Sequence, residues 1–118
     1  MANALFIGWG HAVRGREQQS LQVFNEALQY FGGLQQRGEI EAFEPVALEP
    51  HGGDLYGFLL LRGDPDKLNR VRASEEFRRI VSRGALVVED MGVATAFVGD
   101  DLTRQFEIFQ QQAGELAG

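Results

Sequence analysis

Three side chains suited to chemistry, Trp9, His11 and Arg14, stand close together near the start of the chain. An imidazole exchanges protons near neutral pH, a guanidinium holds an anion, and an indole covers a flat apolar molecule. Together they could bind and protonate an anionic aromatic substrate. We therefore predict His11 and Arg14 as catalytic residues and Trp9 as a ligand-binding residue. The alternative interpretation is a core or interface tryptophan beside a solvated loop.

Three further residues are predicted to bind a ligand. Tyr56 and Arg62 share one face of an apolar segment, and they would line a pocket if that face meets a second sheet. Otherwise they are ordinary polar groups at strand ends. Asp90, expected on a later strand, could act as a general base if it is buried. The alternative for Asp90 is a turn residue whose carboxylate is already satisfied.

The sequence lacks the patterns expected of a metal or cofactor site. There is no cysteine, and the two histidines, His11 and His51, are far apart in sequence. The glycines around Trp9 do not form a dinucleotide-binding loop, since Val13 stands where that motif needs a glycine. We therefore expect no metal and no cofactor.

Size and charge limit the class of protein. A chain of 118 residues is expected to form a single domain, residues 1–118, with its own apolar core. The net charge of −6 argues against nucleic acid or an anionic membrane surface as a partner. The start of the sequence lacks the pattern of a signal peptide, and no apolar run is long enough to span a membrane. We therefore expect a cytoplasmic protein.

Two apolar runs, at 4–9 and 55–64, lack the alternation of a strand with one wet face. They are predicted to be central strands that are covered on both faces. The segment 39–48 is half polar and contains Pro45, so we expect it at a sheet edge. Valine-rich material at 85–98 predicts a fourth strand, most firmly over 90–98.

Helices are predicted between these strands. Apolar residues spaced by three and four mark a helix from about Arg16 to Gln36, which we expect to weaken near Phe31 because two glycines follow. The apolar stripe of this helix is Leu21, Phe24, Leu28, Phe31 and Leu34.

The second helical region is predicted to be broken. Its apolar stripe changes direction near Ser74, which favours two pieces at about 65–72 and 75–83, with Gly84 as the end. Asp100 and Asp101 are expected to cap a further helix at the C-terminus. The apolar stripe of that helix is Leu102, Phe106, Phe109, Ala113 and Leu116.

The order of elements, β-α-β-β-α-β with an extra C-terminal helix, predicts an α+β, ferredoxin-like fold with a four-stranded antiparallel sheet. The strands at 4–9 and 55–64 are central in such a sheet, which agrees with their apolar patterns. Both crossover helices cover the same face, so the other face is left bare. Large bare apolar faces are unusual on monomers, and a second copy of the chain is the simplest cover. We therefore predict a homodimer through the open sheet face.

This element order across residues 4–98, with the segment Ser-Glu-Glu-Phe-Arg-Arg-Ile-Val at 74–81 on a broken second crossover helix, resembles the dimeric α+β barrel superfamily. That superfamily includes antibiotic-biosynthesis monooxygenase-like, stress-responsive barrel and EthD-like proteins. The resemblance implies two subunits paired sheet to sheet. Its members include cofactor-free oxygenases, haem degraders, small isomerases and proteins without known activity. The haem degraders carry a histidine on the second crossover helix, whereas residues 65–83 contain none.

These observations favour a homodimer that binds a small, partly apolar molecule between sheet and helices. Within the resemblance, such a protein could act as a cofactor-independent oxygenase or isomerase, with His11, Arg14 and Trp9 nearest the chemistry. One alternative is a non-catalytic binding or interaction module, which the lack of a strong catalytic motif favours. Another is an ACT-like ligand-sensing domain, which would pair its sheets edge to edge.

Overall fold

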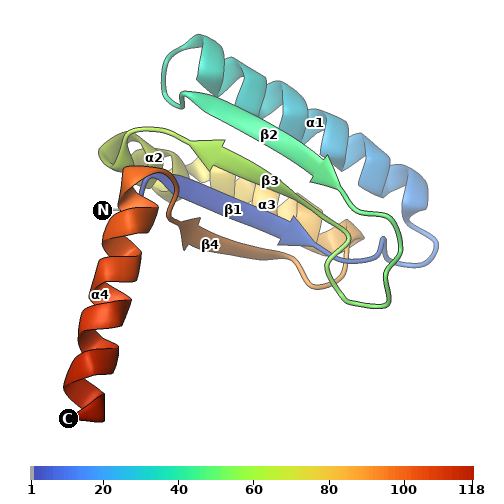
Figure 1. Cartoon of the computed structure of the whole chain (residues 1–118). Coiled ribbons are helices and arrows are strands. Elements are labelled where there is room, and N and C mark those ends of the chain that lie inside the picture. Colours follow the sequence, from blue (N-terminus) through green and yellow to red (C-terminus); the bar gives the residue numbers. More distant parts are fainter. Residues whose placement is uncertain (1) are drawn as a thin grey trace.

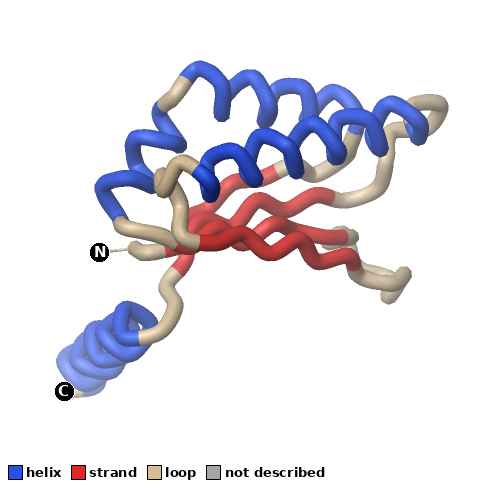
Figure 2. The backbone as a smooth tube through the Cα atoms, turned by 90° about the horizontal axis from the view of Figure 1, so that it is seen from above, coloured by secondary structure: helices blue, strands red, loops and turns tan. Residues whose placement is uncertain are grey.

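The computed structural model describes residues 2–118, which form one sheet with three helices on one face and a fourth helix beyond it (Figures 1 and 2). The elements in chain order are β1 (Ala4–Trp9), α1 (Glu17–Gln36), β2 (Ala42–Ala47), β3 (Gly57–Arg62), α2 (Pro65–Ala73), α3 (Glu75–Val87), β4 (Gly92–Ala96) and α4 (Asp100–Ala117).

The sheet has the strand order β2-β3-β1-β4, and every neighbouring pair is antiparallel. The two strands predicted to be central, β1 and β3, lie in the middle, where Ile7 faces Leu59 across the ladder. The half-polar β2 lies at an edge of the sheet. Pro45, which has no amide hydrogen, therefore removes no hydrogen bond on the outer side of this strand, where no neighbouring strand pairs with it. This is the ferredoxin-like arrangement that the order of elements predicts.

The core lies between the sheet and α1, α2 and α3. Alternate residues of the central strands, such as Leu5 and Leu61, point toward these helices and are almost fully buried. Phe31 of α1 and Phe77 of α3 meet them, with their ring centroids 6.3 Å apart. This packing buries one of the two faces of the central strands.

The opposite face of the sheet is not covered by α1, α2 or α3 (Figure 2). The rings of Phe6 and Phe58 lie on it, with centroids 5.3 Å apart, and Leu60 and Val46 flank them. All four side chains are only half-buried. We call this surface the open face; its existence confirms the prediction of a bare, apolar sheet face.

The helix α1 differs from its prediction in two ways. It continues through Gly32 and Gly33 to Gln36 because Leu34 is buried in the core and holds the last turn in place. The prediction that the helix weakens at Phe31 was therefore wrong. Its buried stripe includes Val23 and Ala27, whereas Leu21 is 59% exposed.

The break in the second helical region is confirmed. The Asp64 carboxylate accepts a hydrogen bond from the Lys67 amide at the start of α2, and the Ser74 hydroxyl accepts one from the Phe77 amide at the start of α3. Both side chains satisfy amide groups that a helix start leaves free.

The predicted end of α3 was wrong. The helix passes through Gly84 and ends at Val87, so residues 85–87 are helical and the fourth strand begins only at Gly92. Gly84 is buried, and a Cβ there would lie 3.0 Å from the Cε atom of Met91. This glycine therefore gives Met91 room to pack rather than ending the helix.

The C-terminal helix α4 points away from the rest of the molecule, and none of its residues is buried (Figure 1). Gly99 occupies its N-cap position with φ of 59°, and no side chain caps the helix. Asp100 and Asp101 lie in the first turn, where their charge favours the helix dipole, so their prediction as caps was wrong. Within residues 2–118, no helix is long and apolar enough to cross a membrane. The division into domains stays a prediction.

Candidate functional site: a cavity between the sheet and the helices

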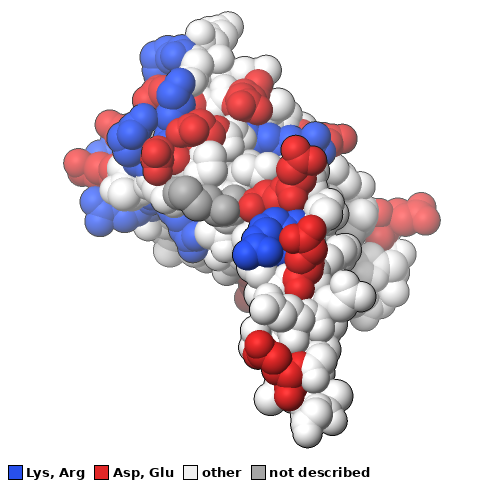
Figure 3. Space-filling view, turned by 60° about the vertical axis from the view of Figure 1, so that its left-hand side comes forward, with Lys and Arg blue, Asp and Glu red and all other residues white. Residues whose placement is uncertain are grey.

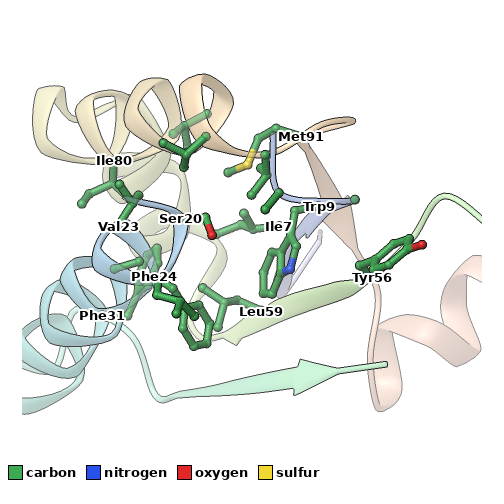
Figure 4. A pocket seen from close by; sticks show the side chains of 18 residues that line it. Ile7, Trp9, Ser20, Val23, Phe24, Phe31, Tyr56, Leu59, Ile80 and Met91 are labelled. Atoms are coloured by element: carbon green, nitrogen blue, oxygen red, sulfur yellow. The ribbon is translucent and has the colours of Figure 1, made fainter. Parts of the chain in front are cut away.

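A cavity of about 260 Å³ lies between one end of the sheet and the helices α1 and α3 (Figure 4). Its walls come from β1, β3, α1, α3 and the segment that follows α3, and most of them are apolar side chains. Its volume is slightly below the range of about 300–1,000 Å³ that is typical of sites for drug-sized ligands. The lining side chains labelled in Figure 4 are Ile7, Trp9, Ser20, Val23, Phe24, Phe31, Tyr56, Leu59, Ile80 and Met91.

Polar groups in the cavity wall are few, and no charged side chain is among the lining residues. The Ser20 hydroxyl donates a hydrogen bond of 2.7 Å to the backbone carbonyl of Glu17, so its own proton is already engaged. The indole of Trp9 and the phenol of Tyr56 supply the remaining side-chain polarity. Such a wall favours a neutral, mostly apolar occupant, because a charge would lose its hydration without gaining a partner.

Trp9 is held in place by its neighbours. A Cβ atom on Gly57, its partner residue on β3, would lie 2.6 Å from the indole Cζ2 atom, so the ring lies directly over this glycine. On its other side the indole meets Phe24 edge to face, with centroids 5.7 Å apart. The orientation of Trp9 in the cavity therefore depends on a missing side chain at position 57.

His11 and Tyr56 form a pair at this end of the sheet. The Tyr56 hydroxyl lies 2.6 Å from Nε2 of His11, and the two ring centroids are 3.9 Å apart. Backbone hydrogen bonds fix both residues: the Tyr56 amide donates to the Trp9 carbonyl, and the Glu89 amide donates to the His11 carbonyl. His11 is exposed and Tyr56 half-buried, so the pair stands between the cavity and solvent. Either member can donate, according to the imidazole tautomer.

The other predicted site residues lie elsewhere or face solvent. Arg14 occupies an exposed turn and does not line the cavity. Arg62 is at the far end of β3, opposite Ala4, and is exposed. Asp90 is in the turn before β4 rather than on a strand, with φ of 54° and an exposed side chain. The structure thus brings together Trp9, His11 and Tyr56 but not Arg14 or Arg62. The functional roles of all six residues stay predictions.

Sequence reasoning missed the helical wall of the cavity. Ile80, Gly84 and Val87 line it from one face of α3, and Val23 lines it from α1. No signal in the sequence marks this wall, because apolar residues on a helix face look the same whether they fill a core or line a cavity, and the space beside Gly84 is taken by Met91. Within residues 2–118, no group of three or more acidic, histidine or cysteine side chains is placed to hold a metal ion.

No family model matches the sequence, and no curated protein matches it. Solved structures do match in shape. One is a dimeric protein of unknown function with a ferredoxin-like fold from Bacteroides fragilis. The alignment covers 79% of this chain and 93% of that protein's chain, at 14% identity and a TM-score of 0.56. For SnoaB, a cofactor-independent oxygenase from Streptomyces nogalater, the alignment covers 84% of this chain and 97% of the SnoaB chain, at 16% identity and a TM-score of 0.51. For PA3566 from Pseudomonas aeruginosa, the alignment covers 84% of this chain and 96% of the PA3566 chain, at 12% identity and a TM-score of 0.56. At these identities the likeness establishes a shared ferredoxin-like fold.

Proposed function

We propose that this protein is a homodimer that binds a small, neutral, mostly apolar molecule in the cavity between the sheet and the helices. The observation that carries the proposal is the cavity itself: about 260 Å³ of space walled by apolar side chains, with the indole of Trp9 in its wall. Close packing normally leaves few voids larger than a water molecule in a protein interior. A space of this size, partly open to solvent, is therefore a candidate site for a small ligand.

The cavity wall indicates the shape of the ligand. The rings of Trp9 and Phe24 present flat surfaces on which an aromatic ring can stack. The hydroxyl of Tyr56 points away from the other lining side chains (Figure 4) and contacts the exposed His11, so it adds little polarity to the wall. A planar, mostly apolar molecule suits such a cavity.

The open face supports the homodimer. Half-buried Phe6, Phe58, Leu60 and Val46 leave an apolar surface that no helix of the same subunit covers. A second copy related by a twofold axis would bury the same surface on both subunits. A protein of the same fold from Bacteroides fragilis is described as dimeric.

Trp9 allows a direct test, because it is the only tryptophan in the chain. Its indole N–H gives a single, unambiguous side-chain signal in a ¹H–¹⁵N NMR spectrum. We expect 1-naphthol, which is neutral at pH 7, to shift this signal in a saturable way. The matched control, 1-naphthalenesulfonate, has the same ring system with a fixed charge and should leave it unchanged. No shift with either probe, or equal shifts with both, would contradict the proposal.

A second candidate function is catalysis as a cofactor-independent oxygenase or isomerase. The specific observation is the 2.6 Å contact between His11 and Tyr56, because both reactions can begin when a protein group takes a proton from the substrate. SnoaB, which shares the fold, is described as a cofactor-independent oxygenase. In this reading the Nε2–H of His11 donates to the Tyr56 hydroxyl, which holds the imidazole in position, and Nδ1 of His11 accepts the proton from the substrate.

Oxygen uptake with a panel of hydroxynaphthalenes tests the catalytic candidate. If the protein is active, His11→Gln should lower kcat by about 10²–10⁴-fold, the usual share of a general base, without abolishing binding of 1-naphthol. His51→Gln is the matched control, because His51 is the other histidine and lies in an exposed turn. If 1-naphthol binds but the protein shows neither oxygen uptake nor isomerisation, the catalytic candidate is excluded. The non-catalytic binding module and the ACT-like sensor then remain as alternatives. A cytoplasmic location stays a prediction from the sequence.

A further inference from the structure

The C-terminal helix α4 carries an apolar stripe that its own subunit does not cover. Phe106, Phe109 and Leu116 are 64%, 72% and 88% exposed. We call the stripe formed by Leu102, Phe106, Phe109, Ala113 and Leu116 the α4 seam. Exposed aromatic residues in a row are costly on a solvated helix, so this surface is expected to have a partner.

The spacing of the α4 seam indicates the kind of partner. Its residues follow one another at alternating steps of four and three, the repeat of the a and d positions of a coiled coil. A helix that packs on a sheet or a core needs a wider stripe, with further apolar residues beside these two positions. The narrow seam therefore favours a second helix as the partner.

The residues beside the seam indicate that this second helix can be another α4. The flanking e and g positions of the repeat hold uncharged side chains: Thr103, Gln105, Gln110, Gln112 and Ala117. The charged residues Asp100, Asp101, Arg104, Glu107 and Glu115 occupy the other positions. Figure 3 shows the acidic side chains along this helix with uncharged surface beside them. Two copies of an acidic helix can pair along such a seam, because their charges stay away from the contact.

The position of α4 leaves the seam free for a second copy. The helix leaves the sheet at the end of β4 and lies on the side opposite α1–α3, which is the side of the open face (Figures 1 and 2). It does not fold back over the sheet of its own subunit, and none of its side chains is buried there. A second subunit seated on the open face would therefore arrive on the same side as α4.

We propose that α4 pairs along its seam with the α4 helix of a second copy of this chain. Formation of an isolated helix is unfavourable at its first turn, so α4 gains stability from any contact that holds it in place. The pairing therefore rests in part on the proposed homodimer, because subunits joined through the open face raise the effective concentration of one α4 for the other. Pairing between two dimers, which would form a tetramer, uses the same seam.

Two charge substitutions test the pairing. Phe109→Glu places a charge in the seam, whereas Gln111→Glu places the same charge on the opposite side of the helix. We expect the first to weaken self-association by at least about tenfold and the second to change it less than about twofold, as measured by sedimentation equilibrium. Equal behaviour of the two variants would overturn the proposal.

The absence of cysteine permits a second test. Single cysteines are introduced at Leu102, Phe106 or Phe109, and the variants are mixed pairwise in a glutathione buffer. Pairing of two α4 helices predicts rapid disulfide formation between particular seam positions, because paired cysteines need Cα atoms about 4.4–6.8 Å apart. Gln111→Cys is the off-seam control. Seam cysteines that cross-link no faster than this control would show that α4 packs on another surface.

The outcomes separate this inference from the proposed function. If Leu60→Glu on the open face breaks the dimer and Phe109→Glu does not, the homodimer stands and the α4 pairing falls. If only Phe109→Glu dissociates the copies, α4 pairing stands without help from the open face, and both the open-face homodimer and its role in raising the effective concentration of α4 fall. The naphthol test on Phe109→Glu should match the parent protein, because α4 does not line the cavity.

Discussion

The indole of Trp9 lies across Gly57, so that a Cβ atom on the glycine would be 2.6 Å from the ring. The two residues are direct partners in the β1–β3 ladder. The same missing side chain lets the ring turn toward Phe24 and form one wall of the cavity. A glycine on a central strand thus determines how the only tryptophan of the chain faces the cavity.

Replacement of Gly57 by alanine should displace Trp9. We expect an unfolding free energy lower by about 1–3 kcal/mol, the usual cost of forcing an extra methyl group into a packed site. The Trp9 fluorescence should shift in wavelength, and the affinity for 1-naphthol should fall. Gly92→Ala on β4 is the matched control, because a Cβ there meets no atom within 4 Å. A Gly57→Ala protein with unchanged fluorescence and stability would contradict this account.

Leu60→Glu should disrupt the proposed homodimer. Leu60 lies on the open face beside Phe6, and a twofold axis would place two new carboxylates in one interface. Burial of unpaired charges is costly, so we expect the dissociation constant to rise by about 100-fold or more in sedimentation equilibrium. Gln29→Glu, which adds the same charge to an exposed position of α1, should leave the dimer intact. Monomeric parent protein at micromolar concentration would exclude the dimer altogether.

Ser74→Ala should destabilise the break between α2 and α3. The Ser74 hydroxyl accepts a hydrogen bond of 3.2 Å from the Phe77 amide, and loss of such a cap typically costs about 0.5–2 kcal/mol. Urea denaturation measures this change. Ser82→Ala on the exposed part of the same helix removes a hydroxyl without removing a cap, so its effect should stay within about 0.5 kcal/mol. Similar losses in both variants would argue against a capping role.

Tyr30 should contribute to the loss of stability in alkali. Burial raises the pKa of its hydroxyl above the ordinary value of 10.0; Glu76 and Glu39 raise it further, while the Ser74 hydrogen bond and Arg37 oppose the change. Because the folded protein holds this proton more tightly, the favourable contribution is complete below pH 10.0 and is lost as the pH rises through the raised pKa. Urea denaturation should therefore show a shallower alkaline decline for Tyr30→Phe. A parallel decline in both proteins would exclude this role.

The central strands could be predicted because their apolar runs lack the polar alternation of strands at a sheet edge. The run at 4–9 matches β1 residue for residue, and Pro45 marks the edge position of β2. The break at Ser74 could also be predicted, since a change in stripe direction and a capping residue coincide there. These are local signals, and tertiary packing does not reverse them.

The errors arose where packing between distant segments decides the outcome. Gly84 looks like a helix end, but Met91 packs against it and the helix continues. Gly32 and Gly33 likewise look like a helix end, but Leu34 is buried in the core and α1 continues to Gln36. The contact between His11 and Tyr56 joins residues 45 positions apart, so spacing along the sequence does not reveal it.

Gly10 sits where three distant parts of the chain converge: a Cβ there would lie 2.8 Å from the Asp54 carbonyl, 3.1 Å from the Glu89 carbonyl and 3.2 Å from the Asp90 carboxylate. The rim of the cavity is therefore assembled from loops rather than from the sheet that supports it. Insertions or deletions in the 48–56 or 88–91 connections would remodel the entrance while the ladder and the core keep their geometry. Relatives with this framework could admit molecules of quite different size through changes in loop length alone.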